Sequence, residues 1–159
     1  MLLIIHLLVG AVIGKYVNNL GLIILLALAS HYILDIIPHY KMTPLPRYLK
    51  EGFNGTTFKG LLVRAVEPVF GLILFGIVVY LNKEKAVPML TAGFFAFFPD
   101  LINFIGWKYS SLSGIRKLVP YPGNLFYHEA KSKIIGIGTH IILGIAALVA
   151  IFIKLKPNT

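Results

Sequence analysis

Five long apolar stretches, separated by polar or basic segments, are the feature that most constrains the fold of this chain. They cover residues 1–14, 20–38, 61–81, 86–107 and 134–153. A helix that crosses a bilayer needs about 20 mostly apolar residues, with a range of about 17–25, and the last four stretches meet this length. Because backbone polar groups must be paired within hydrocarbon, we interpret the stretches as helices. The sequence therefore predicts an all-α, polytopic transmembrane bundle of about five helices, in a single domain over residues 1–159.

The composition agrees with a lipid environment. Charged residues make up 13% of the chain, against about 25% in soluble domains. The absence of cysteine excludes disulfides and thiolate metal ligands. No basic region or cleavage site precedes the first stretch, so we expect it to remain as a helix. Gly10 and Gly14 form a GxxxG pattern, which is typical of close helix packing in membranes.

The basic residues predict an orientation. With five spans, the N-terminus and the two long connections, residues 38–60 and 108–133, lie on one side of the membrane, which we call side A. These connections carry four and five Lys or Arg residues, nine together, against five on the opposite side. The positive-inside rule favours side A as cytoplasmic. We expect a multi-pass protein of the inner membrane, with the lipid bilayer as its partner and no nucleic acid.

Ionisable residues within the apolar stretches are few, and burying each is costly, at about 2.5–3.5 kcal/mol near the bilayer centre. They are His6, His31, Asp35, Arg64, Glu67, Asp100 and His140, with His39 and His128 at the edges. Because successive helices run in opposite directions, all seven fall in the half nearest side A, most of them roughly 5–12 Å from that edge. This placement predicts a polar His/Asp cavity near one membrane face.

The central motif is His31-Tyr-Ile-Leu-Asp35, followed by His39. His31 and Asp35 are four residues apart and share one helix face, so they form a ligand pair suited to zinc, manganese or iron. The alternative is that Asp35 only orients His31 and that His39 lies at the interface. Asp100 is interpreted as a further ligand or a general base, with Asn103 as a substrate contact; the alternative is an Asp that caps a turn broken by proline.

The other candidates are each open to a second interpretation. His6 and His140 either bind the metal or pack as single hydrogen-bonded histidines, and His128 either joins the site or lies at the surface. Arg64 and Glu67 are three residues apart, so they either neutralise each other or act in catalysis, with Arg64 binding a phosphate and Glu67 serving as general base.

Four short motifs resemble a known family, the LexA-regulated inner-membrane family of predicted metal-dependent hydrolases. Residues 29–35 resemble its SHxxxD element, and residues 98–100 its LPDxDH element. Residues 139–143 resemble its THSLL element, and residues 6–8 its GHLL element, although the order along the chain differs. The resemblance implies a helical membrane fold with a His/Asp metal site that performs hydrolysis.

The leading functional prediction is a membrane-embedded hydrolase that uses a divalent metal, with zinc favoured and manganese or iron as alternatives. The preferred ligands are His31, Asp35, Asp100 and His140, completed by His39, His6 or His128. A phospholipid or another lipid-linked phosphate is the expected substrate. A proton- or cation-coupled transporter and a non-catalytic membrane scaffold are the alternatives.

Overall fold

A computed structural model describes residues 2–39, 55–108 and 132–153, and this part of the chain is helical. Its elements are α1 (Leu3–Tyr16), α2 (Leu20–Ile36), α4 (Gly55–Leu81), the short 3-10 helix η1 (Lys83–Lys85), α5 (Ala86–Lys108) and α6 (Lys133–Phe152). The prediction of five α-helices and an all-α fold is confirmed for these residues. α4 begins earlier than expected, at Gly55 rather than residue 61.

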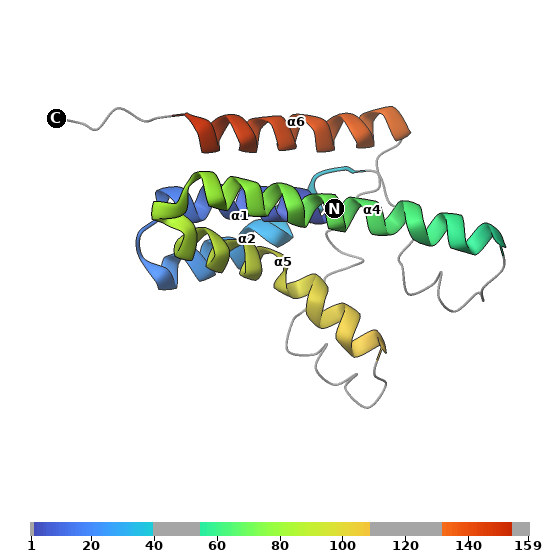
Figure 1. The fold of residues 1–159 in the computed structure, drawn as a ribbon, viewed down its shortest axis with the longest axis horizontal. Helices are drawn as coiled ribbons and strands as arrows, with labels where there is room; N and C mark the ends of the chain where they lie inside the picture. The colour runs from blue at the N-terminus through green and yellow to red at the C-terminus, as the bar shows by residue number, and fades with distance from the viewer. Residues whose placement is uncertain (1, 40–54, 109–131, 154–159) are drawn as a thin grey trace.

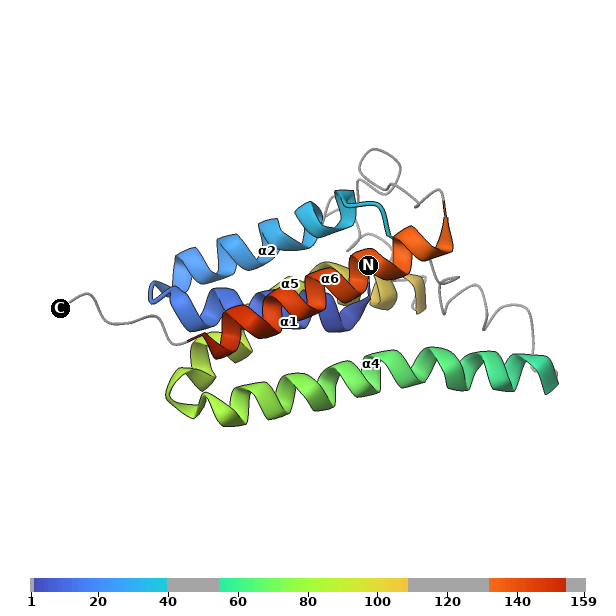
Figure 2. The same ribbon diagram turned by 90° about the horizontal axis from the view of Figure 1, so that it is seen from above.

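The first helix lies at the centre of the bundle. α1 contacts α2, α4, α5 and α6, and Figures 1 and 2 show it among these helices. Its sequence is apolar on every side, which is the pattern of a helix enclosed by others. Leu7, Leu8 and Ala11 are almost fully buried, and they share one core cluster with Phe75, Met89 and Ile151 from other helices.

Glycines bring α1 unusually close to α5. A Cβ atom added at Gly10 would lie 2.8 Å from the Cα atom of Gly93, and one added at Gly14 would lie 2.5 Å from the Cα atom of Met89. Neither position can hold a larger side chain without separating the two helices. The GxxxG pattern therefore forms a close helix contact, as small residues do in membrane proteins.

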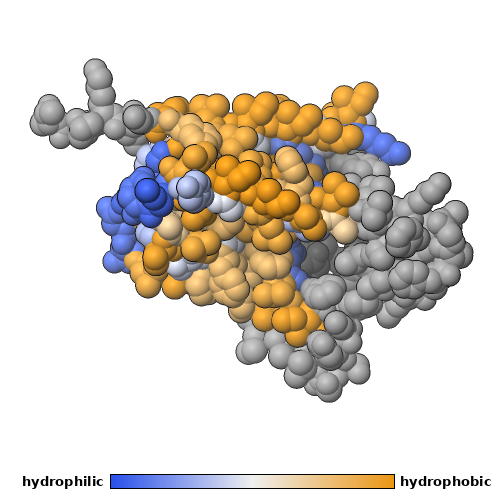
Figure 3. Space-filling view, in the orientation of Figure 1, coloured by the Kyte–Doolittle hydropathy of each residue, from blue (hydrophilic) through white to orange (hydrophobic). Residues whose placement is uncertain are grey.

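One end of the bundle is built from polar contacts between turns. Asn19 caps α2 by accepting a hydrogen bond from the Leu22 amide, and Lys85 donates to Asn18 over 2.8 Å. Lys15 and Tyr16, at the end of α1, donate to main-chain carbonyls at the end of α6. Figure 3 shows this end as a hydrophilic patch beside a largely hydrophobic surface.

The opposite end gathers the termini of other helices. The beginning of α1, the end of α2, the second half of α5 and the beginning of α6 all point toward it in both views (Figures 1 and 2). α5 contains Pro99, which lacks the amide hydrogen that the helix needs at this position, and the helix bends along its length in Figure 1. Of the residues singled out for chemistry, His6, His31, Asp35 and Asp100 lie toward this end.

Two helical segments of the described residues are long and apolar enough to cross a membrane, Lys83–Asn103 and Lys133–Phe152. Three other apolar helices are shorter: Leu3–Tyr16, Leu20–Ile36 and Ala65–Leu81. α1 has 14 residues and extends about 21 Å, less than the roughly 30 Å of a hydrocarbon core. By length and composition, two of the five predicted spans are thus supported.

Candidate metal centre

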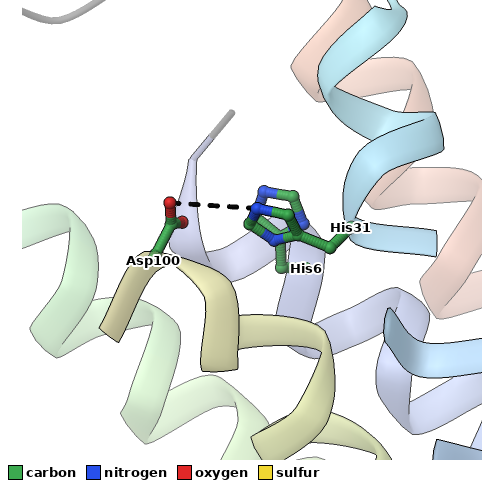
Figure 4. Close-up of side chains that lie close together, drawn as sticks. All are labelled: His6, His31 and Asp100. Carbon is green, nitrogen blue, oxygen red and sulfur yellow. Dashed lines mark ion pairs between the residues drawn. The ribbon is translucent and has the colours of Figure 1, made fainter. Parts of the chain in front are cut away.

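Three helices bring two histidines and two aspartates together near the end of the bundle where α1 begins and α2 ends. α1 supplies His6, α2 supplies His31 and Asp35, and α5 supplies Asp100. The two histidines are 0% and 1% exposed, and their rings stack with centroids 4.3 Å apart. Figure 4 shows both rings beside the Asp100 carboxylate. The helical spacing that predicted His31 and Asp35 on one face holds, because both side chains face this cluster.

The distances within the cluster suit a shared cation better than direct hydrogen bonds. His31 Nε2 lies 3.5 Å from Asp35 Oδ2 and 3.9 Å from Asp100 Oδ1. His6 Nε2 lies 3.6 Å from Asp35 Oδ1. Two ligand atoms on one tetrahedral zinc ion, each about 2.1 Å from the metal, are about 3.4 Å apart. One ligand atom from each of His6, His31 and Asp100 lies within 4.8 Å of the others, so this group could hold a metal ion.

The main chain fixes which nitrogen of His31 faces the carboxylates. His31 Nδ1 lies 2.9 Å from the carbonyl oxygen of Ala96. A carbonyl oxygen can only accept, so Nδ1 carries a proton and donates it. In the neutral ring the lone pair is then on Nε2, which faces Asp35 and Asp100. A lone pair that faces two carboxylate oxygens is unfavourable, and a proton on Nε2, a protonated carboxyl group or a metal ion between these atoms would each relieve it.

His6 completes the cluster with unpaired ring nitrogens. Neither Nδ1 nor Nε2 has a hydrogen-bond partner within the described residues, although both atoms are buried. Leaving a buried polar group unpaired costs about 1–3 kcal/mol. A buried nitrogen that points at a carboxylate 3.6 Å away is a natural metal ligand, so His6 belongs with the candidate ligands.

His140 lies apart from this group and pairs with His39. Their ring centroids are 5.7 Å apart, and both are buried, at 6% and 2% exposed. Sequence analysis favoured His140 over His6 as the partner of His31, Asp35 and Asp100. In the structure the contacts with Asp35 come from His6 and His31.

Glu67 has a clear structural partner. Its Oε1 atom accepts a hydrogen bond of 2.9 Å from the backbone amide of Ile4, in the first turn of α1. The amides of a first helical turn have no partner within the helix, so Glu67 caps α1 from α4. This contact gives the carboxylate a role in holding His6 in place, whereas sequence analysis proposed it as general base.

The remaining predicted residues differ in what the structure describes. Asn103 is three residues after Asp100 on α5, and its amide nitrogen is buried without a partner among the described residues. Arg64 lies within α4, but its side chain is outside the described part. His128 is outside the described residues altogether.

Sequence analysis missed the Ala96 carbonyl, because a main-chain acceptor leaves no signal in residue type.

Comparison of the chain with models of known families, with characterised proteins and with solved structures finds no match. The fold and the site themselves define the class of protein: a helical chain with two possible membrane-spanning segments and a buried His/Asp group that could hold a metal ion.

Proposed function

We propose that this chain is a multi-pass inner-membrane protein that hydrolyses a lipid-linked phosphate or a phospholipid with the help of a divalent metal. The observation that carries the proposal is the position of His31. Its Nδ1 proton is donated to Ala96, and its Nε2 atom faces two carboxylates at distances that fit a shared ion. The motif resemblance to predicted metal-dependent membrane hydrolases supports the same conclusion.

The outer surface supports placement in a bilayer. Large apolar side chains on α2, α4 and α6 are exposed, and the most exposed are Leu25, Ile33, Val66, Tyr80, Ile134 and Ile142. Monomeric soluble proteins rarely expose contiguous apolar surface on this scale. Figure 3 shows hydrophobic side chains over most of the coloured surface beyond the polar end. A bundle of five membrane-spanning helices would place these apolar side chains in lipid. The shorter helices would then be held in the bilayer by contacts with their neighbours.

The site also offers substrate access and polar contacts. The Asp100 side chain is 41% exposed, so the cluster can be reached from outside the core. A divalent ion held there would supply polarisation of a phosphoryl oxygen and activation of water at neutral pH. Asn103, on the same helix as Asp100, contributes an amide donor that has no partner among the described residues, which suits a substrate oxygen. The basic connections on side A would attract an anionic headgroup.

The arrangement favours hydrolysis over transport. A pathway for protons or cations needs polar groups through both halves of the membrane. Away from the cluster, the centre of the described bundle is filled by apolar side chains such as Leu8, Met89 and Ile151. Small residues fill the second core cluster, where Ala27, Ala92 and Ala96 meet.

Metal analysis tests the proposal directly. Purified wild-type protein, dialysed against zinc or manganese and then against metal-free buffer, is expected to retain metal in stoichiometric amount. His31→Ala and Asp35→Ala are each expected to retain less than a tenth of that amount, because each removes a direct ligand. Glu84→Gln is the control, since it removes an exposed carboxylate from the opposite end. Equal metal content in all four proteins would refute the metal centre.

Hydrolysis is tested on the same proteins. Wild type and Glu84→Gln, reconstituted with vesicles of anionic phospholipid and polyprenyl phosphates, are expected to release a phosphate product that a chelator abolishes. His31→Ala is expected to be inactive with and without added metal. Metal binding without any hydrolysis of lipid phosphates would retain the centre and reject this substrate class.

A further inference from the structure

A proline lies between the two groups that α5 contributes to the surroundings of His31. Pro99 lies inside the helix and is fully buried. The carbonyl oxygen of Ala96, three residues before it, accepts a hydrogen bond of 2.9 Å from His31 Nδ1. The carboxylate of Asp100, the residue after it, lies 3.9 Å from His31 Nε2. Both nitrogens of one imidazole ring therefore meet α5 within one turn of this proline.

Proline changes the main chain of the turn that precedes it. Pro99 has no amide hydrogen to donate to the Phe95 carbonyl, four residues earlier, and in a straight helix its ring would clash with that carbonyl. A helix relieves the clash by bending, and Figure 1 shows α5 bent along its length. The carbonyl groups of the opened turn then become available to donors on neighbouring helices. Ala96 lies in this turn.

Small side chains let α2 approach the opened turn. Ala27 on α2 and both Ala92 and Ala96 on α5 are fully buried and belong to one core cluster. His31 follows Ala27 by four residues, so it shares the same face of α2. Its ring therefore reaches the main chain of α5 without meeting a bulky side chain. A hydrogen bond from a histidine to a backbone carbonyl orients many metal-binding histidines.

The bend also separates a buried part of α5 from an accessible one. Ala96, before the bend, is 0% exposed, whereas the side chain of Asp100, after it, is 41% exposed. In Figure 1 the part of α5 after the bend turns away from α1 and α4. The Asp100 carboxylate can therefore face the buried His31 ring and still be reached from outside the core.

We propose that Pro99 is a positioning residue of the candidate metal centre. The bend that it imposes presents the Ala96 carbonyl to one nitrogen of His31 and the Asp100 carboxylate to the other. Pro99 offers no ligand atom itself and acts through these two residues. The inference rests on the proposed function where it concerns a bound metal, whereas the hydrogen bond from His31 to Ala96 forms without one.

The hydrogen bond is tested first, in metal-free protein in detergent. Pro99→Ala restores the missing amide donor and is expected to straighten α5. Pro88→Ala is the matched control, because Pro88 is the third residue of the same helix, where an amide has no partner within the helix. Proton NMR follows the Nδ1 proton of His31, identified by its absence in His31→Ala. Slow exchange of this proton with water is expected in wild type and Pro88→Ala, and fast exchange in Pro99→Ala.

Metal affinity is then measured on the same proteins by Mn²⁺ titration with electron paramagnetic resonance. Loss of the group that orients a metal-binding histidine typically weakens binding about 10–100-fold. The dissociation constant is expected to rise by this factor in Pro99→Ala and to stay unchanged in Pro88→Ala. Pro99→Ala gains a main-chain hydrogen bond, so without metal it is expected to unfold no lower than wild type. If it does not fold, Pro99→Ser takes its place, since serine restores the amide but still favours a bend; its effects are expected in the same direction and smaller.

The outcomes separate this inference from the proposed function. A slowly exchanging His31 proton and an unchanged Mn²⁺ dissociation constant in Pro99→Ala would overturn the positioning role and leave the metal centre standing. Equal changes in Pro88→Ala would show a general effect of removing proline from α5, which also overturns it. If wild type binds no Mn²⁺, the metal centre is rejected, while a His31 proton protected in wild type and lost in Pro99→Ala would still support the role of Pro99.

Discussion

His31 is the residue whose surroundings most restrict the chemistry of the site. One ring nitrogen is committed to the Ala96 carbonyl, and the other faces two carboxylates. Ala96 is fully buried and lies on α5, one turn before Asp100. The same helix therefore fixes the orientation of the His31 ring and supplies one of the oxygens that the ring faces. Small shifts of α5 along α2 would change both contacts together.

A metal-dependent gain in stability is expected for the wild-type protein. An ion that binds only the folded state raises the free energy of unfolding by about 2.7 kcal/mol at one hundred times its dissociation constant. Thermal unfolding in detergent, with zinc or with chelator, is expected to show this difference in wild type and in Glu84→Gln. His31→Ala should unfold at the same temperature in both conditions. A metal-dependent shift that survives in His31→Ala would contradict the assignment.

The sequence named the residues that meet in this cluster as candidates, but it did not predict which of them meet. His31 and Asp35 could be placed together because helical periodicity puts positions four apart on one face. Asp100, His6 and His140 were further candidates because they lie at a similar depth along their predicted spans. Depth does not say which helix faces which, so it could not show that His6 joins Asp35 while His140 meets His39.

At the scale of the helices, the bundle depends on close contact between α1 and α5. Sequence patterns predicted the five helices, because long apolar runs bounded by glycine, proline and charge are unambiguous. They did not show that α1 is the central helix, because helix length and apolar pattern do not say which helices pack against each other. Its position follows from Gly10 and Gly14, which let α5 approach the backbone.

Gly14→Ala is expected to destabilise the protein by about 1–3 kcal/mol, the usual cost of overpacking a tight contact. The added Cβ atom would lie 2.5 Å from Met89 Cα and from the Pro88 carbonyl oxygen. Gly76→Ala is the matched control, because nothing lies within 4 Å of its added Cβ atom. That variant should be neutral or slightly stabilising, since alanine favours helix by about 0.5–1 kcal/mol. The free energy of unfolding of both variants is measured in mixed micelles. An equal change in the two variants would refute the close contact.

Glu67 is expected to act as a cap on α1 rather than as a general base. Glu67→Ala removes an acceptor from a charge-assisted hydrogen bond and should cost about 1.5–3 kcal/mol of stability. Glu67→Gln keeps an oxygen acceptor and should lose about 1 kcal/mol or less. Unfolding and hydrolysis are measured side by side. A glutamine variant that is stable yet inactive would restore the general-base assignment.

For the whole molecule, the two ends of the bundle are expected to lie on opposite sides of a membrane. The chain lacks cysteine, so single cysteines can report each end. Glu84 and Ser132 are both exposed and lie at opposite ends of the described bundle. In intact cells, a membrane-impermeant maleimide is expected to label Glu84→Cys and to leave Ser132→Cys unlabelled until lysis. Equal labelling of both variants would contradict a spanning bundle.

The central position of α1 has a consequence for how the protein is made. α1 precedes the other described helices along the chain, and α2, α4, α5 and α6 all pack against it. It is too short to be anchored firmly by lipid alone. Its enclosure is finished only when α6 arrives and Lys15 and Tyr16 reach the carbonyls at the end of that helix. His6, on α1, therefore finds its final surroundings only after α6 has been made.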